Sequence, residues 1–176
     1  MAQAQTLKSG EFSPARVAPE ITLPATTGKP FALSALRGKV VVLEFGYTQC
    51  PSVCPVSLAS LTQARALLGP AANDVQVVFV TVDPERDTVP HLRDYLAQFD
   101  RSFVGIGGSR AQIDGLLRAY GISATKRPVA GSNSEYFMDH SSYLYFIDRR
   151  GMLRALMPFG RPAADIAHDL DILLKR

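Results

Sequence analysis

The sequence predicts an α/β fold with a mixed central sheet flanked by helices and a small hairpin near the N-terminus. Two runs, residues 40–45 and 75–82, are almost wholly apolar, which is typical of strands covered on both faces. Each is followed by a segment whose apolar residues have helical spacing, so strands and helices alternate in the first half of the chain. The 176 residues suffice for one domain with its own core.

The composition is that of an ordinary globular protein, with 47% hydrophobic and 20% charged residues. Nineteen basic and sixteen acidic residues give a net charge of +3, and the charges are scattered, so no nucleic-acid partner is expected. Two cysteines are too few for a disulfide scaffold. No stretch approaches the roughly 20 apolar residues that cross a bilayer.

The first twelve residues contain no apolar signal core. We therefore expect residues 1–13 to be a disordered leader or an added segment, and residues 14–176 to form the folded domain. Either the protein is cytosolic, or a targeting segment or membrane anchor has been removed. The motifs described below favour the second interpretation.

The first elements follow from apolar runs and turn residues. Residues 21–24 and 30–33 flank Thr26-Thr27-Gly28-Lys29 and predict the small hairpin. Residues 40–45 form the first buried strand. A helical stripe then covers residues 52–68, with Ser52 placed to cap the helix and Gly69-Pro70 placed to end it.

The middle of the chain repeats this order. Residues 75–82 form the second buried strand, and Thr88 can cap a helix that runs to about Phe99. Residues 103–107 are a short strand candidate. Ser109 then opens a third helix that stops at Gly121.

The last third begins with residues 123–139, which lack periodicity and are rich in Ser, Gly, Pro and Asn, so we expect a long loop. Strands at residues 142–147 and 152–157 flank a turn, and Pro162 begins a final helix. This order fits a sheet sandwiched by helices in the thioredoxin manner. A loop of about seventeen residues inside a compact domain is often functional.

The cysteines, Cys50 and Cys54, lie where the first buried strand gives way to a helix. Free N–H groups at a helix N-terminus stabilise thiolate and lower the pKa of a nearby thiol. Thiolate is both a nucleophile and a soft metal ligand. The segment is therefore suited to a reversible disulfide, to a thiophilic metal, or to both in turn.

A third donor could come from His140, at the end of the predicted loop and directly before a core strand. In a thioredoxin-like arrangement this loop packs beside the thiol loop. Two thiolates and one imidazole suit Cu(I) and can also accommodate Cu(II), whereas a closed zinc site would need a fourth ligand. His91 and His168 fall within predicted helices elsewhere and are interpreted as solvated.

Three segments together resemble the Sco/SenC family of copper-binding assembly factors for cytochrome oxidase. They are residues 46–55 (GYTQCPSVCP), residues 80–88 (VTVDPERDT) and residues 139–148, which begin Asp139-His140-Ser141. Their order and spacing span about 100 of the 176 residues. The cysteine spacing alone is weak evidence, but the three segments together are specific.

The resemblance implies a thioredoxin-like fold with copper, as Cu(I) or Cu(II), held by Cys50, Cys54 and His140. It also implies that the protein reduces copper or delivers it to the dinuclear copper centre of oxidase subunit II. Other copper chaperones or thiol reductants would be further partners. Family members usually carry a membrane anchor, with the folded domain in the bacterial periplasm or the mitochondrial intermembrane space. This chain would then be a soluble truncation.

One position departs from the family pattern. Ser52 stands where the family commonly has Asp. Ser caps helices about as well as Asp, so the fold is expected to survive. We expect the absence of this negative charge to affect the reactivity of the cysteines and the docking of a partner, but not the identity of the metal ligands.

Each candidate residue also has a structural interpretation. Cys50 and Cys54 could form a static disulfide, and a lone histidine such as His140 is more often structural than a ligand. Asp83 ends a strand before a proline, where Asp commonly satisfies turn N–H groups. It could equally be an outer-shell carboxylate or a weak Cu(II) ligand, so we keep it as a secondary site candidate.

Three functions remain at this point. The leading one is a copper metallochaperone. The second is a thiol–disulfide oxidoreductase in which Cys50 and Cys54 are the redox pair and the oxidase copper-site cysteines are kept reduced. The third is a peroxiredoxin-like peroxidase, because Val53-Cys54-Pro55 resembles its peroxidatic segment. However, Pro51 replaces the activating Thr three residues before the cysteine.

Overall fold

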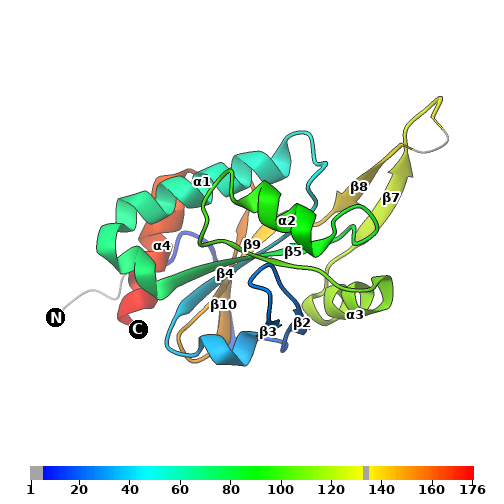
Figure 1. Ribbon diagram of the computed structural model, residues 1–176. Helices are drawn as coiled ribbons and strands as arrows, with labels where there is room; N and C mark the ends of the chain where they lie inside the picture. Colours follow the sequence, from blue (N-terminus) through cyan, green and yellow to red (C-terminus); the bar gives the residue numbers. More distant parts are fainter. Residues whose placement is uncertain (1–5, 133–134) are drawn as a thin grey trace.

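The computed structural model describes residues 6–132 and 135–176, and its centre is a six-stranded mixed sheet (Figure 1). The strand order is β1-β10-β9-β4-β5-β6. Strands β4, β5 and β6 are parallel, whereas β9 is antiparallel to β4, β10 to β9 and β1 to β10. The bounds in chain order are β1 Gly10–Val17, β4 Val40–Gly46, β5 Val75–Thr81, β6 Val104–Ile106, β9 Tyr143–Ile147 and β10 Met152–Pro158.

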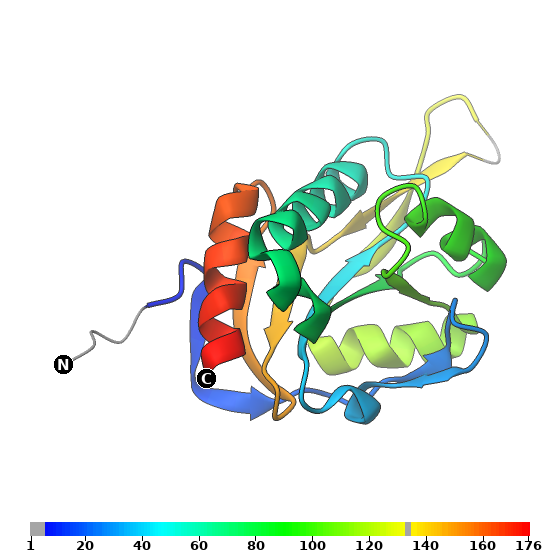
Figure 2. The same cartoon turned by 60° about the vertical axis from the view of Figure 1, so that its left-hand side comes forward.

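In the described residues, four α-helices cover the two faces of the sheet. They are α1 Val53–Leu68, α2 Val89–Leu96, α3 Arg110–Tyr120 and α4 Ala163–Lys175. Figure 2 shows α1 and α4 side by side on one face and α3 across the other. Short 3-10 helices at Leu33–Leu36 and Gly69–Asp74 complete the connections. No helix in the described ranges combines the length and the apolarity that crossing a membrane requires.

The core is built around β4, which is buried at all of its positions. Alternate residues of β4 face opposite layers. The Phe45 ring lies 5.3 Å from the Tyr120 ring of α3, whereas a Cβ atom on Gly46 would meet Cys54 of α1. The prediction of an apolar strand covered on both faces is therefore confirmed, and it places the end of β4 beneath the N-terminus of α1.

Several predicted boundaries are confirmed by local geometry. The hairpin appears as β2 Thr22–Pro24 paired with β3 Pro30–Ala32. Thr88 caps α2 by accepting a hydrogen bond from the His91 backbone N–H, and Ser109 forms a capping box with Gln112 at α3. Ser52 occupies the N-cap position of α1 but makes no side-chain cap hydrogen bond, so that detail of the prediction is wrong.

The predicted boundary after residue 13 requires correction. Residues 1–5 of the proposed leader lie outside the described residues, but Gly10–Val17 form β1 and pair with β10 at the edge of the main sheet. Ser9 donates through its backbone N–H and its hydroxyl to the buried Asp169 carboxylate. The exposed side chains of β1 give no apolar alternation, which is why its sequence resembles a leader.

The predicted long loop at residues 123–139 is also wrong in part. It contains β7 Ala124–Pro128 and most of β8 Tyr136–His140, an antiparallel pair that forms its own two-stranded sheet. Figure 1 shows this hairpin extending beyond the main sheet. Met138 is the one buried side chain among these ten residues, so the apolar alternation that marks a half-buried strand is missing. Residues 133–134 of the predicted loop lie outside the described residues.

Candidate functional site

The two cysteines lie at the junction between β4 and α1, as the sequence predicts. Both are free thiols, with Cys50 partly exposed in the loop and Cys54 fully buried in the first turn of α1. The Cys54 backbone N–H points at the Cys50 sulfur, with 3.4 Å between N and Sγ. The helix N-terminus therefore presents a hydrogen-bond donor to Cys50.

The two thiols differ in acidity because of these contacts. The pKa of Cys50 is lowered from 9.0 to about 5, mainly because the Cys54 thiol donates to its sulfur, with help from backbone N–H groups of residues 52–54. The same bond, together with burial, raises the pKa of Cys54. At neutral pH the pair therefore consists of an exposed thiolate and a buried thiol. That state is competent for nucleophilic attack and for binding a soft metal.

Gly46 makes room for the buried sulfur. A Cβ atom at this position would lie 2.7 Å from the Cys54 Sγ and 2.8 Å from the Phe79 ring. Both groups are buried, so neither can move aside freely. A side chain at the end of β4 is therefore excluded by the way α1 packs on the sheet.

His140 ends β8 and borders the same pocket as Cys50. The pocket has a volume of about 260 Å³, and its wall joins the cysteine loop to the hairpin. The His140 ring lies edge-on to the Tyr47 ring with centroids 5.9 Å apart, and its Nδ1 lies 3.0 Å from the Ser141 carbonyl oxygen. The lining residues are Tyr47, Cys50, Pro51, Ser52, Val53, Arg127, Phe137, Met138, Asp139, His140 and Ser142.

The three predicted ligands approach one another without converging. Cys54 lies below the pocket and is absent from its lining, whereas Cys50 and His140 are both at its surface. Within residues 6–132 and 135–176, no group of three or more His, Cys, Asp or Glu side chains is arranged to hold a metal ion. The ligand set Cys50, Cys54 and His140 therefore stays a prediction.

A buried carboxyl group lies on the α1 face of β4. Burial raises the pKa of Glu44 from 4.5 to about 8, although a hydrogen bond from the Ser57 hydroxyl opposes this shift, and negative charge on Cys50 adds to it. Its Oε2 atom is buried and has no hydrogen-bond partner among the described residues. An adjoining cavity of about 10 Å³, comparable to one water, is also lined by Ser57 and His140. At neutral pH, Glu44 is therefore mostly a neutral acid.

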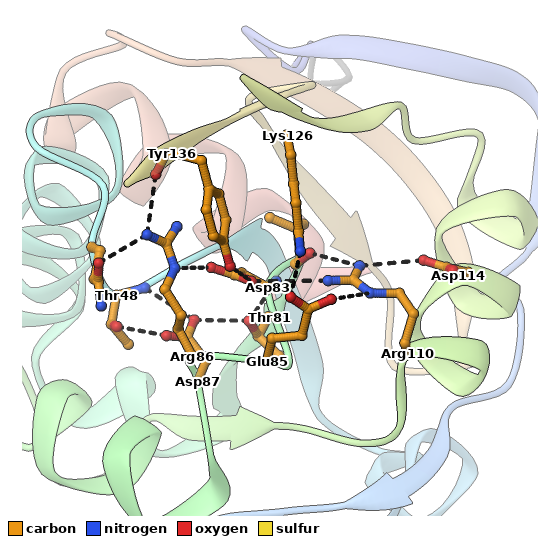
Figure 3. A network of polar contacts seen from close by, with 12 residues as sticks. Thr48, Thr81, Asp83, Glu85, Arg86, Asp87, Arg110, Asp114, Lys126 and Tyr136 are labelled. Atoms are coloured by element: carbon orange, nitrogen blue, oxygen red, sulfur yellow. Dashed lines mark hydrogen bonds and ion pairs between the residues drawn. The ribbon is translucent and has the colours of Figure 1, made fainter. Parts of the chain in front are cut away.

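Asp83 does not line the pocket that Cys50 and His140 share, and it belongs to a network of polar side chains (Figure 3). Its carboxylate is fully buried, pairs with Arg86 and accepts a hydrogen bond of 2.9 Å from the Tyr136 hydroxyl. Both carboxylate oxygens thus have partners. The turn N–H groups of Arg86 and Asp87 donate to the Asp83 backbone carbonyl oxygen, at 3.2 and 3.0 Å, and not to its side chain. Its role as a direct ligand or outer-shell group stays a prediction.

Arg86 and Asp87 connect this network to the cysteine loop. Arg86 Nη1 donates to the Gln49 side-chain oxygen at 2.9 Å and to the Tyr136 carbonyl oxygen at 3.1 Å. Asp87 accepts from the Thr48 backbone N–H at 3.0 Å and from the hydroxyls of Thr48 and Thr81. Burial raises the pKa of Asp87, and these bonds oppose that shift.

Sequence reasoning assigned no role to Glu44, Arg86 or Asp87, although signals existed. Glu44 is a lone carboxylate in an apolar strand, which marks either a buried acid or a functional group. Arg86 and Asp87 belong to a charged cluster directly after a buried strand, in a segment that carries the family resemblance. The remaining histidines are outside the pocket: His91 lies in α2 beside Thr48, and His168 lies in α4 beside Asp169.

Comparison with known proteins identifies what this arrangement is similar to. A family model described as SCO1/SenC matches residues 10–175. The SCO2-like protein of Rickettsia felis is 35% identical over 124 residues, which are 70% of this chain and 60% of that protein. This chain thus spans about 60% of the length of the first curated relatives that it matches.

Solved structures are similar over nearly the whole chain. Bradyrhizobium japonicum ScoI with copper bound is 34% identical, with a TM-score of 0.82, over 90% of this chain and 99% of that one. Apo Sco1 from Thermus thermophilus is 32% identical, with a TM-score of 0.86, over 99% and 100% of the two chains. The thioredoxin-like fold expected from the sequence is therefore confirmed.

Proposed function

The chain belongs to the SCO1/SenC family, and from that membership we propose that it binds one copper ion through Cys50, Cys54 and His140. The observation that carries the proposal is the shared pocket, which has Cys50 on one side and His140 on the other. Two sulfurs and one imidazole are a ligand set that suits Cu(I) and tolerates Cu(II). A relative that is 34% identical has been solved with copper bound.

Copper binding at this site requires two changes in the protein. Cys54 has to lose its proton, because the thiolate and not the thiol is the metal ligand. In the metal-free protein the Cys54 thiol donates a hydrogen bond to the Cys50 sulfur. When copper binds, this hydrogen bond is lost and both sulfurs bind the cation instead. His140 has to approach the sulfurs, since its ring now packs against Tyr47. Proton release on copper uptake therefore belongs to the proposal.

The cellular role follows the family resemblance. We propose that the chain delivers copper to, or prepares thiols at, the dinuclear copper centre of cytochrome oxidase subunit II. Other copper chaperones or thiol reductants would supply copper or electrons. The periplasmic face of the inner membrane, reached through an anchor, is the proposed location. Because the chain spans about 60% of its first curated relatives, these statements about the whole protein are proposals.

Asp83 is proposed to act on the site from a distance. Its oxygens are engaged by Arg86 and Tyr136, so an outer-shell role fits its contacts better than direct coordination. Arg86 in turn reaches Gln49, the neighbour of Cys50. The effect of Asp83 would thus pass through Arg86.

The test is copper titration of the fully reduced protein, followed by the thiolate-to-copper charge-transfer spectrum. We expect one copper per chain, loss of the charge-transfer band in Cys50→Ser, and an altered Cu(II) spectrum with weaker binding in His140→Ala. His91→Ala serves as a matched control, because His91 is an exposed helix residue outside the pocket. Unchanged Cu(II) affinity and spectrum in His140→Ala would refute the assigned ligand set.

A second function is favoured by the acidity of the thiols. With its pKa lowered to about 5, Cys50 is thiolate at neutral pH, and Cys54 lies against it as a resolving thiol. We propose thiol–disulfide exchange as this second function, with the thiols reduced before they bind metal. A reduction potential too negative for exchange with the thiols of a partner would exclude it.

A further inference from the structure

Arg86 contacts three segments that are far apart in the sequence (Figure 3). Its Nε pairs with Asp83, two residues after β5 ends. Its Nη1 donates to the Gln49 side chain in the cysteine loop and to the Tyr136 carbonyl oxygen in β8. The guanidinium group also stacks on the Tyr136 ring, with 3.7 Å from Cζ to the ring centroid. Asp83, Arg86 and Tyr136 are called the Arg86 cluster below.

The Arg86 cluster joins the two sides of the pocket. Gln49 directly precedes Cys50, and Tyr136 begins the five-residue strand that ends at His140. Strand β8 pairs only with β7 among the described strands, so its ladder does not attach it to the main sheet. The chain itself ties His140 to the main sheet, because β9 begins at Tyr143. Beyond this link, the distance between Cys50 and His140 depends on side-chain contacts that hold the hairpin in place.

The other attachments of the hairpin are of a different kind. Met138 is buried in the core, and Lys126 of β7 pairs with the exposed Glu85. Neither of these contacts reaches the cysteine loop. Tyr47, three residues before Cys50, contacts the hairpin through the edge of the His140 ring and through a hydrogen bond from the Met138 backbone N–H. Among the residues drawn in Figure 3, Arg86 alone forms hydrogen bonds to both the Gln49 side chain and the backbone of β8.

We infer that Arg86 is a positioning residue that sets the separation of His140 from the cysteine pair and thereby tunes copper affinity. This inference rests on the proposed function. This role depends on the forked shape of the guanidinium group. Its Nε binds Asp83, and its Nη1 donates to Gln49 and Tyr136. A lysine at this position would keep the charge beside Asp83, but its single ammonium group cannot reproduce this fork.

The test uses Arg86→Lys, because the retained charge avoids leaving the buried Asp83 carboxylate without a cation. Arg110→Lys is the matched control. Arg110 contacts Glu85, Asp114 and the Val82 carbonyl in the same network, and it lies 3.9 Å from Asp83. None of these contacts involves the hairpin or the cysteine loop.

The first measurement is hydrogen exchange in the copper-free proteins. Losing hydrogen bonds to a charged group corresponds to about tenfold or more in an opening equilibrium. We therefore expect amides of β7 and β8 to exchange about tenfold faster in Arg86→Lys, with β4 and β5 unchanged, and no change in the hairpin of Arg110→Lys. Unchanged hairpin exchange in Arg86→Lys would overturn the inference whatever the copper result.

The second measurement is Cu(II) affinity, in a cycle with His140→Ala. Changes in groups that orient a ligand typically cost about 10–100-fold in metal affinity. We expect a loss of this size for Arg86→Lys alone and no further loss in Arg86→Lys/His140→Ala relative to His140→Ala. An equal loss in both backgrounds would mean that Arg86 acts without His140 and would overturn the inference.

The two proposals fail in different ways. If the wild-type protein binds no copper, or if His140→Ala binds it normally, the proposed ligand set falls and the copper part of this inference falls with it. If the wild type binds copper through His140 while Arg86→Lys binds it equally well, only the inference about Arg86 is wrong.

Discussion

The cysteine loop and the β7–β8 hairpin border the same pocket but are held in opposite ways. The cysteine loop follows β4, which is buried throughout, and leads into a helix that packs Cys54 against Gly46. The hairpin is exposed at most of its described positions and is joined to the domain by Arg86, Lys126 and Met138. One side is set by close packing. The other is held by a few side-chain contacts, both polar and apolar, which include the packing of His140 on Tyr47.

This difference separates two properties of the site. Because packed interiors resist displacement, the sulfur geometry is fixed by the same interactions that stabilise the fold. The position of the imidazole depends on hydrogen bonds that can open without unfolding the domain. Changes on the sulfur side should therefore affect stability and thiol chemistry together, whereas changes on the hairpin side should affect the histidine with little loss of stability.

The largest expected effect is the difference in reactivity between the two thiols. With a pKa of about 5 rather than 9.0, Cys50 has about a hundredfold larger thiolate fraction at pH 7. Cys54 is fully buried and its pKa is raised, so we expect iodoacetamide to modify Cys50 at least about a hundredfold faster. The measurement is mass spectrometry of the reduced protein over time. The Cys50 rate should fall only below about pH 5.

Protein denatured in urea is the control for this experiment, since unfolding removes the contacts that distinguish the thiols. Comparable rates for both cysteines in the native protein would contradict the asymmetric packing of the sulfur side.

The next effect concerns Glu44 and the pH dependence of stability. The pKa of Glu44 is raised from 4.5 to about 8, so its contribution to stability is complete below pH 4.5 and is lost as the pH rises to 8. Each pKa unit corresponds to about 1.4 kcal/mol, so the loss amounts to a few kcal/mol. The lowered pKa of Cys50 acts in the opposite sense, because it adds stability as the pH rises from 5 towards 9. Glu44→Gln removes only the Glu44 contribution, so the stability of this variant should rise with pH relative to that of the wild type. The measurement is urea unfolding between pH 4.5 and pH 8.5.

The exposed Glu135 provides a control, and Glu135→Gln should leave the pH dependence of the wild type intact. The same pH dependence of stability in Glu44→Gln and in the wild type would contradict the raised pKa of Glu44.

A smaller effect is expected from Gly46→Ala. The added Cβ would lie within 2.8 Å of the Cys54 sulfur and the Phe79 ring, and overpacking of this kind costs about 1–3 kcal/mol. Gly115→Ala in α3 is the matched control, because the nearest atom there lies 3.9 Å away. We expect urea unfolding to report destabilisation only for Gly46→Ala, with altered alkylation of Cys54. Equal stability of the two variants would contradict the tight packing at the end of β4.

The smallest effect is expected on the hairpin surface. Arg127 and Asp139 form an ion pair of 3.3 Å, and both side chains are more than half exposed. Such pairs contribute about 0.2–1 kcal/mol, so Arg127→Gln should change the free energy of unfolding by no more than that. Cys50 alkylation should stay at the wild-type rate. A loss of several kcal/mol would mean that the hairpin unfolds together with the core. The hairpin would then not differ from the cysteine loop in how it is held.

The structure around the two cysteines was also the part that could best be predicted from the sequence. The apolar run of β4, the stripe of α1 and the cysteines between them are local in sequence, and the caps at Thr88 and Ser109 depend on residues three positions apart. The Sco/SenC resemblance then indicated the family, which the SCO1/SenC match over residues 10–175 confirms.

The remaining features depend on contacts that no local pattern encodes. Strand β1 and the hairpin were missed because their side chains are mostly exposed, so their strands carry no alternation. The bonds of Arg86 to Gln49 and Tyr136 span 37 and 50 residues. The sequence presents Arg86 only as one charge among several after β5, and its contacts with the hairpin become visible only in three dimensions.

With Cys54 sealed beneath Cys50, the two sulfurs cannot exchange roles. A bulky disulfide from outside meets Cys50 first, so the covalent adduct with a partner would form there. Release would require Cys54, once deprotonated, to attack the Cys50 sulfur and expel the partner as a thiolate. The burial of Cys54 thereby fixes the order of the two steps in any thiol–disulfide exchange. The mixed disulfide forms at Cys50 first, and Cys54 then resolves it.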